Sequence, residues 1–171
     1  MKTVKIIVAL AVGTTALPAF AQATGSVTTN GTTTIIQPVT ITQSSALSFG
    51  TIVRPISGSS TITIGTGADT VAATGSAIAL RGPTSRARYT LSGEGGEIVS
   101  ITMPASFAMT KTGAPDLTVT LSRSPLGNAT LSGTAGTTGT AALDIGGSFP
   151  ITSTTVVGSY LGSFTVSVAY N

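Results

Sequence analysis

Cysteine, histidine and tryptophan are all absent from this chain of 171 residues. Without cysteine no disulfide forms, and without either cysteine or histidine the Ser-His-Asp and Cys-His forms of nucleophilic catalysis are excluded. Zinc sites built on the same two residue types are excluded as well. Charged residues make up only 8% of the chain, and the five acidic residues are scattered, so we expect no pair of catalytic carboxylates in a cleft. We therefore expect no enzymatic activity and no bound cofactor or metal.

The first 21 residues have the pattern of a removable export signal. Lys2 and Lys5 precede an apolar run over residues 6–12, and Ala-Phe-Ala at 19–21 is an A-x-A cleavage site. Since two of the eight basic residues belong to this leader, the formal net charge of +3 gives little support to a nucleic-acid partner. No later stretch reaches the roughly 18 apolar residues of a membrane-spanning helix. We expect export through the periplasm to the cell surface, a fimbrium or the medium.

The remainder of the chain has the composition of an all-β protein. Threonine and valine favour strands, and glycine and serine favour turns. A mean hydropathy of +0.47 argues against disorder. Short alternating runs recur without sustained helical spacing, which predicts an antiparallel β-sandwich. The strands are predicted at 35–41, 47–53, 61–64, 77–80, 88–91, 97–103, 107–109, 117–121, 141–145 and 164–170.

A polar segment separates the leader from the first predicted strand. Residues 23–34 contain almost no core-forming side chain, so we predict a signal peptide at 1–21, an extended N-terminal arm at 22–34 and one sandwich domain at 35–171. Pro38 lacks a backbone donor, so the first strand is expected to lie at a sheet edge or to change partner there.

Three glycine-rich or charged motifs have ordinary structural interpretations. Gly93-Glu94-Gly95-Gly96 predicts a hairpin turn that leaves Glu94 and Glu97 in solvent. Residues 65–69 resemble one rung of a glycine-rich calcium repeat, but a single copy does not complete the oxygen shell, so we expect a turn. A basic patch lacks aromatic interleaving beyond Tyr89, and we expect a solvated strand face. That patch consists of Arg81, Arg86 and Arg88.

The C-terminal residues carry the most informative pattern. Phe164, Val166, Val168 and Tyr170 alternate with small or polar residues, so one strand face is apolar up to the last residues. Tyr170 is penultimate, and Gly158 is the fourteenth residue counted back from Asn171. This spacing resembles the C-terminal motif of chaperone–usher pilins.

A second resemblance extends over nearly all of the chain after the leader. IQPVTIT at 36–42 and SALSFGTI at 45–52 are similar to the opening of an exported bacterial domain-of-unknown-function family, the one numbered forty-four-oh-two. Residues 91–93, 101–104 and 158–170 resemble its later blocks. Together the two resemblances imply an immunoglobulin-like, pilin-like sandwich.

The pilin resemblance implies a structural subunit of a bacterial surface fibre, a pilus or fimbria. In pilins the sandwich lacks its last strand, which a periplasmic chaperone lends until the arm of the next subunit replaces it at the outer-membrane usher. Such head-to-tail contacts between identical or related subunits generate filaments. The resemblance assigns chaperone or subunit contacts to Gly158, Phe164, Val166, Val168 and Tyr170, and donor-strand positions to Val27, Ile35 and Ile36.

The same residues are also compatible with a different class of function. A secreted or surface-attached β-sandwich binding module, for example for carbohydrate, would have a complete sandwich and would bind through its loops. A fibre subunit should form ladders that resist mild denaturant, whereas such a module should remain a monomer.

Overall fold

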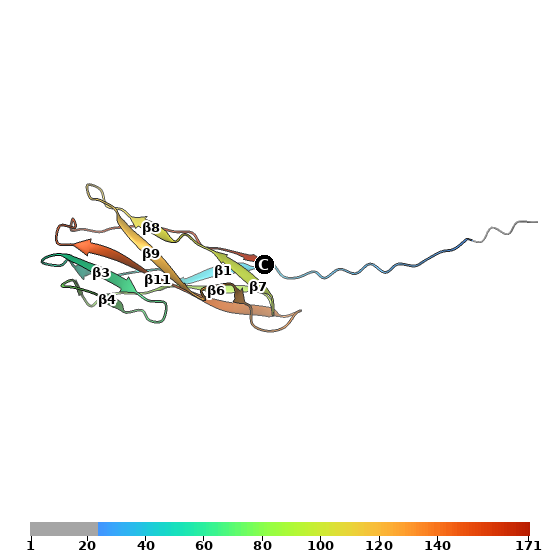
Figure 1. Ribbon diagram of the computed structural model, residues 1–171. Coiled ribbons are helices and arrows are strands. Elements are labelled where there is room, and N and C mark those ends of the chain that lie inside the picture. Colours follow the sequence, from blue (N-terminus) through green and yellow to red (C-terminus); the bar gives the residue numbers. More distant parts are fainter. Residues whose placement is uncertain (1–23) are drawn as a thin grey trace, which may run out of the picture. The chain divides into compact units, whose positions relative to one another are not determined.

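The computed structural model describes residues 24–171, and these residues form β-strands and no helix (Figure 1). One compact unit comprises Ile35–Asn171, and residues 24–34 belong to a separate unit. The predicted signal peptide and its cleavage site lie outside the described residues. The strands are β1 (Thr40–Ser45), β2 (Ile52–Val53), β3 (Ser59–Ile64), β4 (Val71–Ala73), β5 (Ile78–Ala79), β6 (Ala87–Glu94), β7 (Ile98–Thr102), β8 (Ser106–Met109), β9 (Leu117–Ser124), β10 (Ala129–Thr130), β11 (Thr138–Thr152) and β12 (Ser167–Tyr170).

The strands are arranged as an immunoglobulin-like antiparallel β-sandwich, as predicted. The larger sheet has the order β1-β6-β11-β3-β4, with β9 paired to β11 and β8 paired to β9. The smaller sheet has the order β10-β7-β12, and β2 and β5 form a separate ribbon. Every pairing is antiparallel. No helix long and apolar enough to cross a bilayer occurs within residues 24–171.

Two hydrophobic clusters form the core. The first lies between the two sheets and is built from β6, β7, β10 and β11, with Leu91, Val99 and Leu143 fully buried. The second is built from Ile62, Val119, Phe149 and their neighbours at the other end of the domain. Full burial of each such side chain contributes about 1.5–3 kcal/mol. Figure 1 shows β11 running from one end to the other, and it supplies residues to both clusters.

Two glycines in the middle of β11 explain why this strand is much longer than the predicted 141–145. A Cβ on Gly146 would overlap the backbone carbonyl oxygen of Ile64, and a Cβ on Gly147 would press on the side chain of Val119. Neighbouring strands therefore approach β11 more closely here than a side chain would allow. A glycine pair that favours a turn in isolation becomes the point where β3 and β9 both pack against one strand.

The first two predicted strands are wrong in their limits. The first begins at Thr40 and not at residue 35, since Pro38 has no N–H to donate and the N–H of Gln37 donates to the Glu94 carboxylate over 3.3 Å. The second shrinks to the short strand β2 and an isolated bridge at Ser48, because Gly50, with φ of +66°, interrupts the extended backbone.

The predicted hairpin at residues 93–96 is also wrong. β6 and β7 belong to different sheets, so the glycine segment crosses between the two layers. Gly95 donates its N–H to the carbonyl of Thr137 over 2.8 Å, and Gly96 donates to Leu131 over 3.0 Å. Glu94 is only 4% exposed, against the prediction that it faces solvent. The crossover brings its carboxylate inside, where backbone donors bind it.

The predicted basic patch is largely neutralised by two aspartates. Arg86 reaches Asp144 over 2.9 Å and Asp69 over 3.4 Å, and Arg88 reaches Asp69 over 2.5 Å. The side chain of Arg86 is only 15% exposed, so this part of the patch is not a solvated face. Residues 65–69 form the turn between the paired strands β3 and β4, as predicted, and Asp69 accepts from arginine.

Candidate functional site

The C-terminal strand β12 lies at the edge of the smaller sheet and pairs on one side only, with β7. Val168 lies opposite Ile101, and Tyr170 lies opposite Val99. The predicted alternation is present: Phe164, Val166, Val168 and Tyr170 pack half-buried against the first cluster, and the residues between them are exposed.

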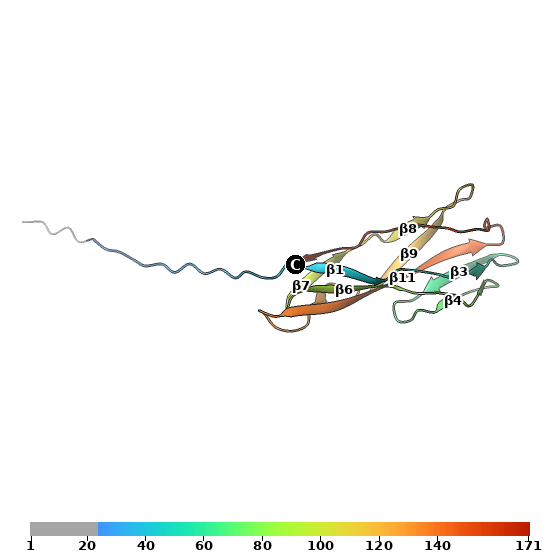
Figure 2. The same ribbon diagram turned by 180° about the vertical axis from the view of Figure 1, so that it is seen from behind.

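Strand β1 is the edge strand of the larger sheet, and it also pairs on one side only, with β6. The two edges lie on the same side of the sandwich: Figures 1 and 2 both show the C-terminus beside β1. Among the described strands, β1 and β12 form no ladder with each other. Each therefore presents an unpaired row of backbone N–H and C=O groups next to the other.

The side chains that border these two edges are apolar and half-buried. We call these side chains the open seam. All of them pack against the first cluster, and all of them remain partly exposed to solvent. Their partial exposure leaves apolar surface open along both edges. The open seam consists of Val39, Ile41 and Leu47 from the β1 side and Phe164, Val166 and Val168 from the β12 side.

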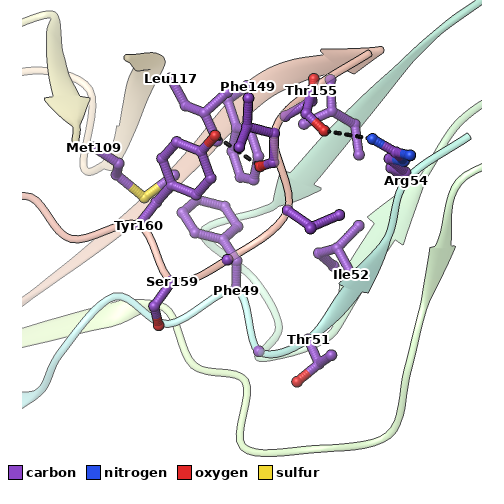
Figure 3. Close-up of a pocket in the computed structure, with 15 residues that line it drawn as sticks. Phe49, Thr51, Ile52, Arg54, Met109, Leu117, Phe149, Thr155, Ser159 and Tyr160 are labelled. Carbon is purple, nitrogen blue, oxygen red and sulfur yellow. Dashed lines mark hydrogen bonds between the residues drawn. The ribbon is translucent and has the colours of Figure 1, made fainter. Parts of the chain in front are cut away.

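A cavity of about 400 Å³ lies where the two edge segments continue beyond the seam (Figure 3). One wall is the chain after β1, residues 49–54, and another is the chain that leads into β12, residues 155–160. Phe49, Phe149 and Tyr160 supply three aromatic rings, and Met109 belongs to the same lining. The cavity therefore suits an apolar or aromatic group of side-chain size.

Two hydrogen bonds join the edge segments, one near each end. Beside the cavity, the guanidinium of Arg54 donates to the carbonyl of Thr155 over 3.0 Å. At the other end, the hydroxyl of Tyr170 donates to the carbonyl of Gln37 over 2.7 Å. Between these two bonds, no hydrogen bond connects residues 38–53 with residues 156–169 in the part of the chain that the structure describes.

Two glycines determine the path of the chain that leads into β12. Gly158 has φ of +140°, a conformation that side-chain-bearing residues rarely adopt, and the aliphatic stem of Lys111 lies where its Cβ would be. A Cβ on Gly162 would overlap the carbonyl oxygen of Ala108. Leu161, between them, pairs with Thr110. Gly158 thus lies in the cavity wall, and Gly162 lets the chain lie directly on β8.

The predicted donor residues are not part of the core. Val27 and Ile35 are 90% and 91% exposed, and Ile36 is also exposed. Residues 24–34 include no strand, and all their side chains are in solvent. The structure therefore gathers the C-terminal site residues along β12 and the cavity, whereas Val27, Ile35 and Ile36 are exposed.

The open seam and the cavity carry little charge. Burial raises the pKa of the Tyr89 phenol, which lies in β6 beside Gln43 of β1, above its ordinary value of 10.0. Among the described residues, no cluster of three or more acidic side chains could hold a metal ion. The arrangement can therefore pair backbone groups and bury apolar side chains, which suits a peptide strand.

Sequence reasoning missed the buried Glu94, the role of Gln37 and the aromatic cavity. The only signal for Glu94 was a lone carboxylate among glycines, and the same pattern is typical of an exposed turn. The cavity residues come from segments as distant as Phe49 and Tyr160, so no local pattern in the sequence marks them.

These features define an immunoglobulin-like β-sandwich with two neighbouring open edges. Residues 39–170 match the family described as a domain of unknown function, DUF4402, and the chain belongs to that family. The match runs from the start of the open seam to Tyr170, so both edges fall within it, whereas the arm lies before it. Neither the curated proteins nor the solved structures contain a match to this chain. The resemblance to chaperone–usher pilins stays a prediction.

Proposed function

We propose that this protein is a structural subunit of a bacterial surface fibre, in which the arm of one copy adds as a strand to the open seam of the next. The observation that carries the proposal is the pair of unpaired edges, β1 and β12, bordered by half-buried apolar side chains. An edge of this kind is an aggregation hazard unless another strand covers it. Strand addition would satisfy both the backbone groups and the exposed apolar surface.

The arm has the features required of the added strand. Val27 and Ile35 are an even number of residues apart, so they share one face when the arm is extended. Gly31 lies midway between them, and the intervening residues on the same face are threonines. Because the polar arm offers few apolar contacts, most of its affinity would come from backbone pairing along β12. The two apolar residues would contact the seam and the cavity.

An exported subunit with an open edge also needs protection before assembly. A periplasmic chaperone that lends a strand to β12, and an outer-membrane usher that exchanges it for an arm, are the partners that fit this requirement. Contacts between the arm of one copy and the seam of another do not close into a ring, so they extend into a filament. No catalytic step and no cofactor is involved.

A peptide covering residues 24–36 provides the direct test. Added to the mature chain, it should raise the thermal midpoint with peptide concentration, because a ligand of the native state stabilises by RT ln(1 + [L]/Kd). A control peptide with Val27 and Ile35 both changed to aspartate should have little effect. No shift with either peptide at millimolar concentration would count against the fibre.

A variant pair tests the arm within the chain. Ile35→Asp should abolish the ladder of multimers seen in mild denaturant, because a charge would enter the apolar seam of the neighbour. Thr34→Asp, on the other face of the extended arm, should retain the ladder. Export and the folded spectrum of both variants should match the unchanged protein.

The cavity favours a second candidate, a secreted binding module that takes its ligand between residues 49–54 and 155–160. Its three aromatic rings and Arg54 could receive an apolar or aromatic ligand without any second copy. This candidate predicts a stable monomer whose stability does not respond to the arm peptide.

A further inference from the structure

The point where the arm joins the domain is held by three different strands. Gln37 accepts a hydrogen bond from the Tyr170 hydroxyl through its backbone carbonyl, over 2.7 Å. Its backbone N–H donates to Oε2 of Glu94 over 3.3 Å, and its side-chain Oε1 accepts from the Thr138 hydroxyl over 2.9 Å. Glu94, Thr138 and Tyr170 belong to β6, β11 and β12, respectively. Every polar group of Gln37 except its side-chain NH₂ therefore has a partner within the domain.

Tyr170 and Glu94 form the centre of this cluster. The Tyr170 hydroxyl accepts from the backbone N–H of Glu94 over 2.7 Å while it donates to Gln37. The buried Glu94 carboxylate accepts from the backbone N–H groups of Gln37 and Gly136, and no cation pairs with it among the described residues. Gly93 makes the approach possible, since a Cβ there would overlap the Tyr170 hydroxyl oxygen. The absence of a side chain at residue 93 thus allows a phenol to reach the backbone of β6.

The same tyrosine belongs to the strand whose second edge is open. β12 is four residues long and pairs only with β7, so its fraying is opposed by one ladder. Whenever Tyr170 moves away, the carbonyl of Gln37 and the N–H of Glu94 both lose their hydrogen bond to its hydroxyl. Fraying of β12 and loosening of the arm's attachment point at Gln37 are therefore linked through the Tyr170 side chain.

We propose that Tyr170 couples the two ends of a subunit: a strand docked on β12 fixes the root of that subunit's own arm. This inference rests on the proposed strand addition, and it assigns Tyr170 and Glu94 the role of positioning residues. Pairing of the second edge suppresses fraying of β12, which keeps the hydrogen bond from Tyr170 to Gln37 formed. By linkage the coupling is reciprocal, so a subunit whose arm root is fixed binds the incoming strand more tightly.

The coupling would give assembly of the fibre a preferred direction. A subunit that has received a strand would present its own arm from a fixed attachment point, and a subunit that has not would present it from a looser one. Growth would then favour chains already begun over new pairs of free subunits. A single hydrogen bond of this type corresponds to about a fivefold change in an equilibrium constant.

Hydrogen exchange at the Gln37 amide tests the coupling. The mature chain carries Val27→Asp in its own arm to keep it monomeric, and the probe is the unchanged peptide of residues 24–36. Saturating peptide should slow exchange at Gln37 about fivefold, with little change at amides of β3, which lies at the second cluster. In the same chain with Tyr170→Phe, which retains the ring, the peptide should bind about fivefold more weakly and leave Gln37 exchange nearly unchanged.

Glu94→Gln provides a second variant in case Tyr170→Phe alters folding. It retains the shape of the side chain but weakens its acceptance from the Gln37 N–H, so exchange at Gln37 should be faster both with and without peptide. Peptide that binds both Tyr170 forms equally, with equal slowing at Gln37, would overturn the coupling and leave strand addition intact. A peptide that does not bind the chain with Tyr170 at all overturns both.

Discussion

The ring of Phe49 meets the ring of Phe149 edge-on, with centroids 4.8 Å apart and ring planes at 86°. Phe49 lies in the chain that continues from β1, and Phe149 lies in β11, so this contact ties one wall of the cavity to the central strand. Aromatic pairs in this geometry add about 0.5–1.5 kcal/mol to the effect of burial alone. Because both rings are buried, this wall of the cavity is part of the second cluster.

The first prediction concerns this aromatic pair. Phe149→Ala should lower the free energy of unfolding by about 3–5 kcal/mol, because it removes a buried ring from the second cluster. Urea denaturation measures the change. Leu126→Ala is the matched control: Leu126 is largely exposed, so its loss should change the free energy by no more than about 0.5 kcal/mol. Similar values for both variants would mean that the second cluster is not packed as described.

The second prediction tests the apolar face of the C-terminal segment. Val166→Asp places a carboxylate against the first cluster and should lower the free energy of unfolding by about 2 kcal/mol or more. Thr165→Asp, one residue away on the exposed face, should be nearly neutral. Thermal denaturation of the two purified variants is the measurement. Equal tolerance of the two aspartates would show that the segment is not buried on one side.

The third prediction concerns the glycine in the cavity wall. Gly158→Ala should destabilise the protein by about 1–3 kcal/mol, because alanine disfavours φ of +140° and its Cβ would displace Lys111. Gly127→Ala should be neutral or slightly stabilising, since a Cβ there meets nothing within 4 Å. The comparison is made by urea denaturation at neutral pH. Destabilisation of the same size at both positions would remove the special role of Gly158.

The fourth prediction follows from the raised pKa of Tyr89. In the folded protein this phenol keeps its proton to a higher pH than in the unfolded chain, where its pKa is close to 10.0. Its contribution to stability is therefore fully present below pH 10 and decreases as the pH rises through 10 towards the folded pKa. Tyr89→Phe should lose stability less steeply than the unchanged protein over this alkaline range. Parallel stability curves for the two proteins would contradict the shift.

The fold was predictable where residues alternate between apolar and polar. The predicted strands at 61–64, 107–109 and 117–121 lie within β3, β8 and β9, because each of them turns alternate side chains inward. The predicted hairpin at 93–96 failed because the partners of its glycines lie at Leu131 and Thr137, beyond any local window. The length of β11 was missed because Gly146 and Gly147 look like a turn until the neighbouring strands are known.

The candidate site was predictable on one side only. The alternation from Phe164 to Tyr170 marked an apolar face, and the structure places that face on the first cluster. The β1 side of the open seam was not recognised from the sequence, because Val39 and Ile41 were assigned to a strand that began at residue 35. The partner of the Tyr170 hydroxyl could not be predicted either, because it lies 133 positions earlier in the chain.

Strand β11 has one further consequence. It joins the two hydrophobic clusters through a single run of backbone, with Leu143 and Ile145 in the first and Phe149 and Ile151 in the second. Neither cluster can come apart without disturbing a strand that the other depends on. The domain should therefore behave as one cooperative unit, with no half-folded intermediate for a protease to cut.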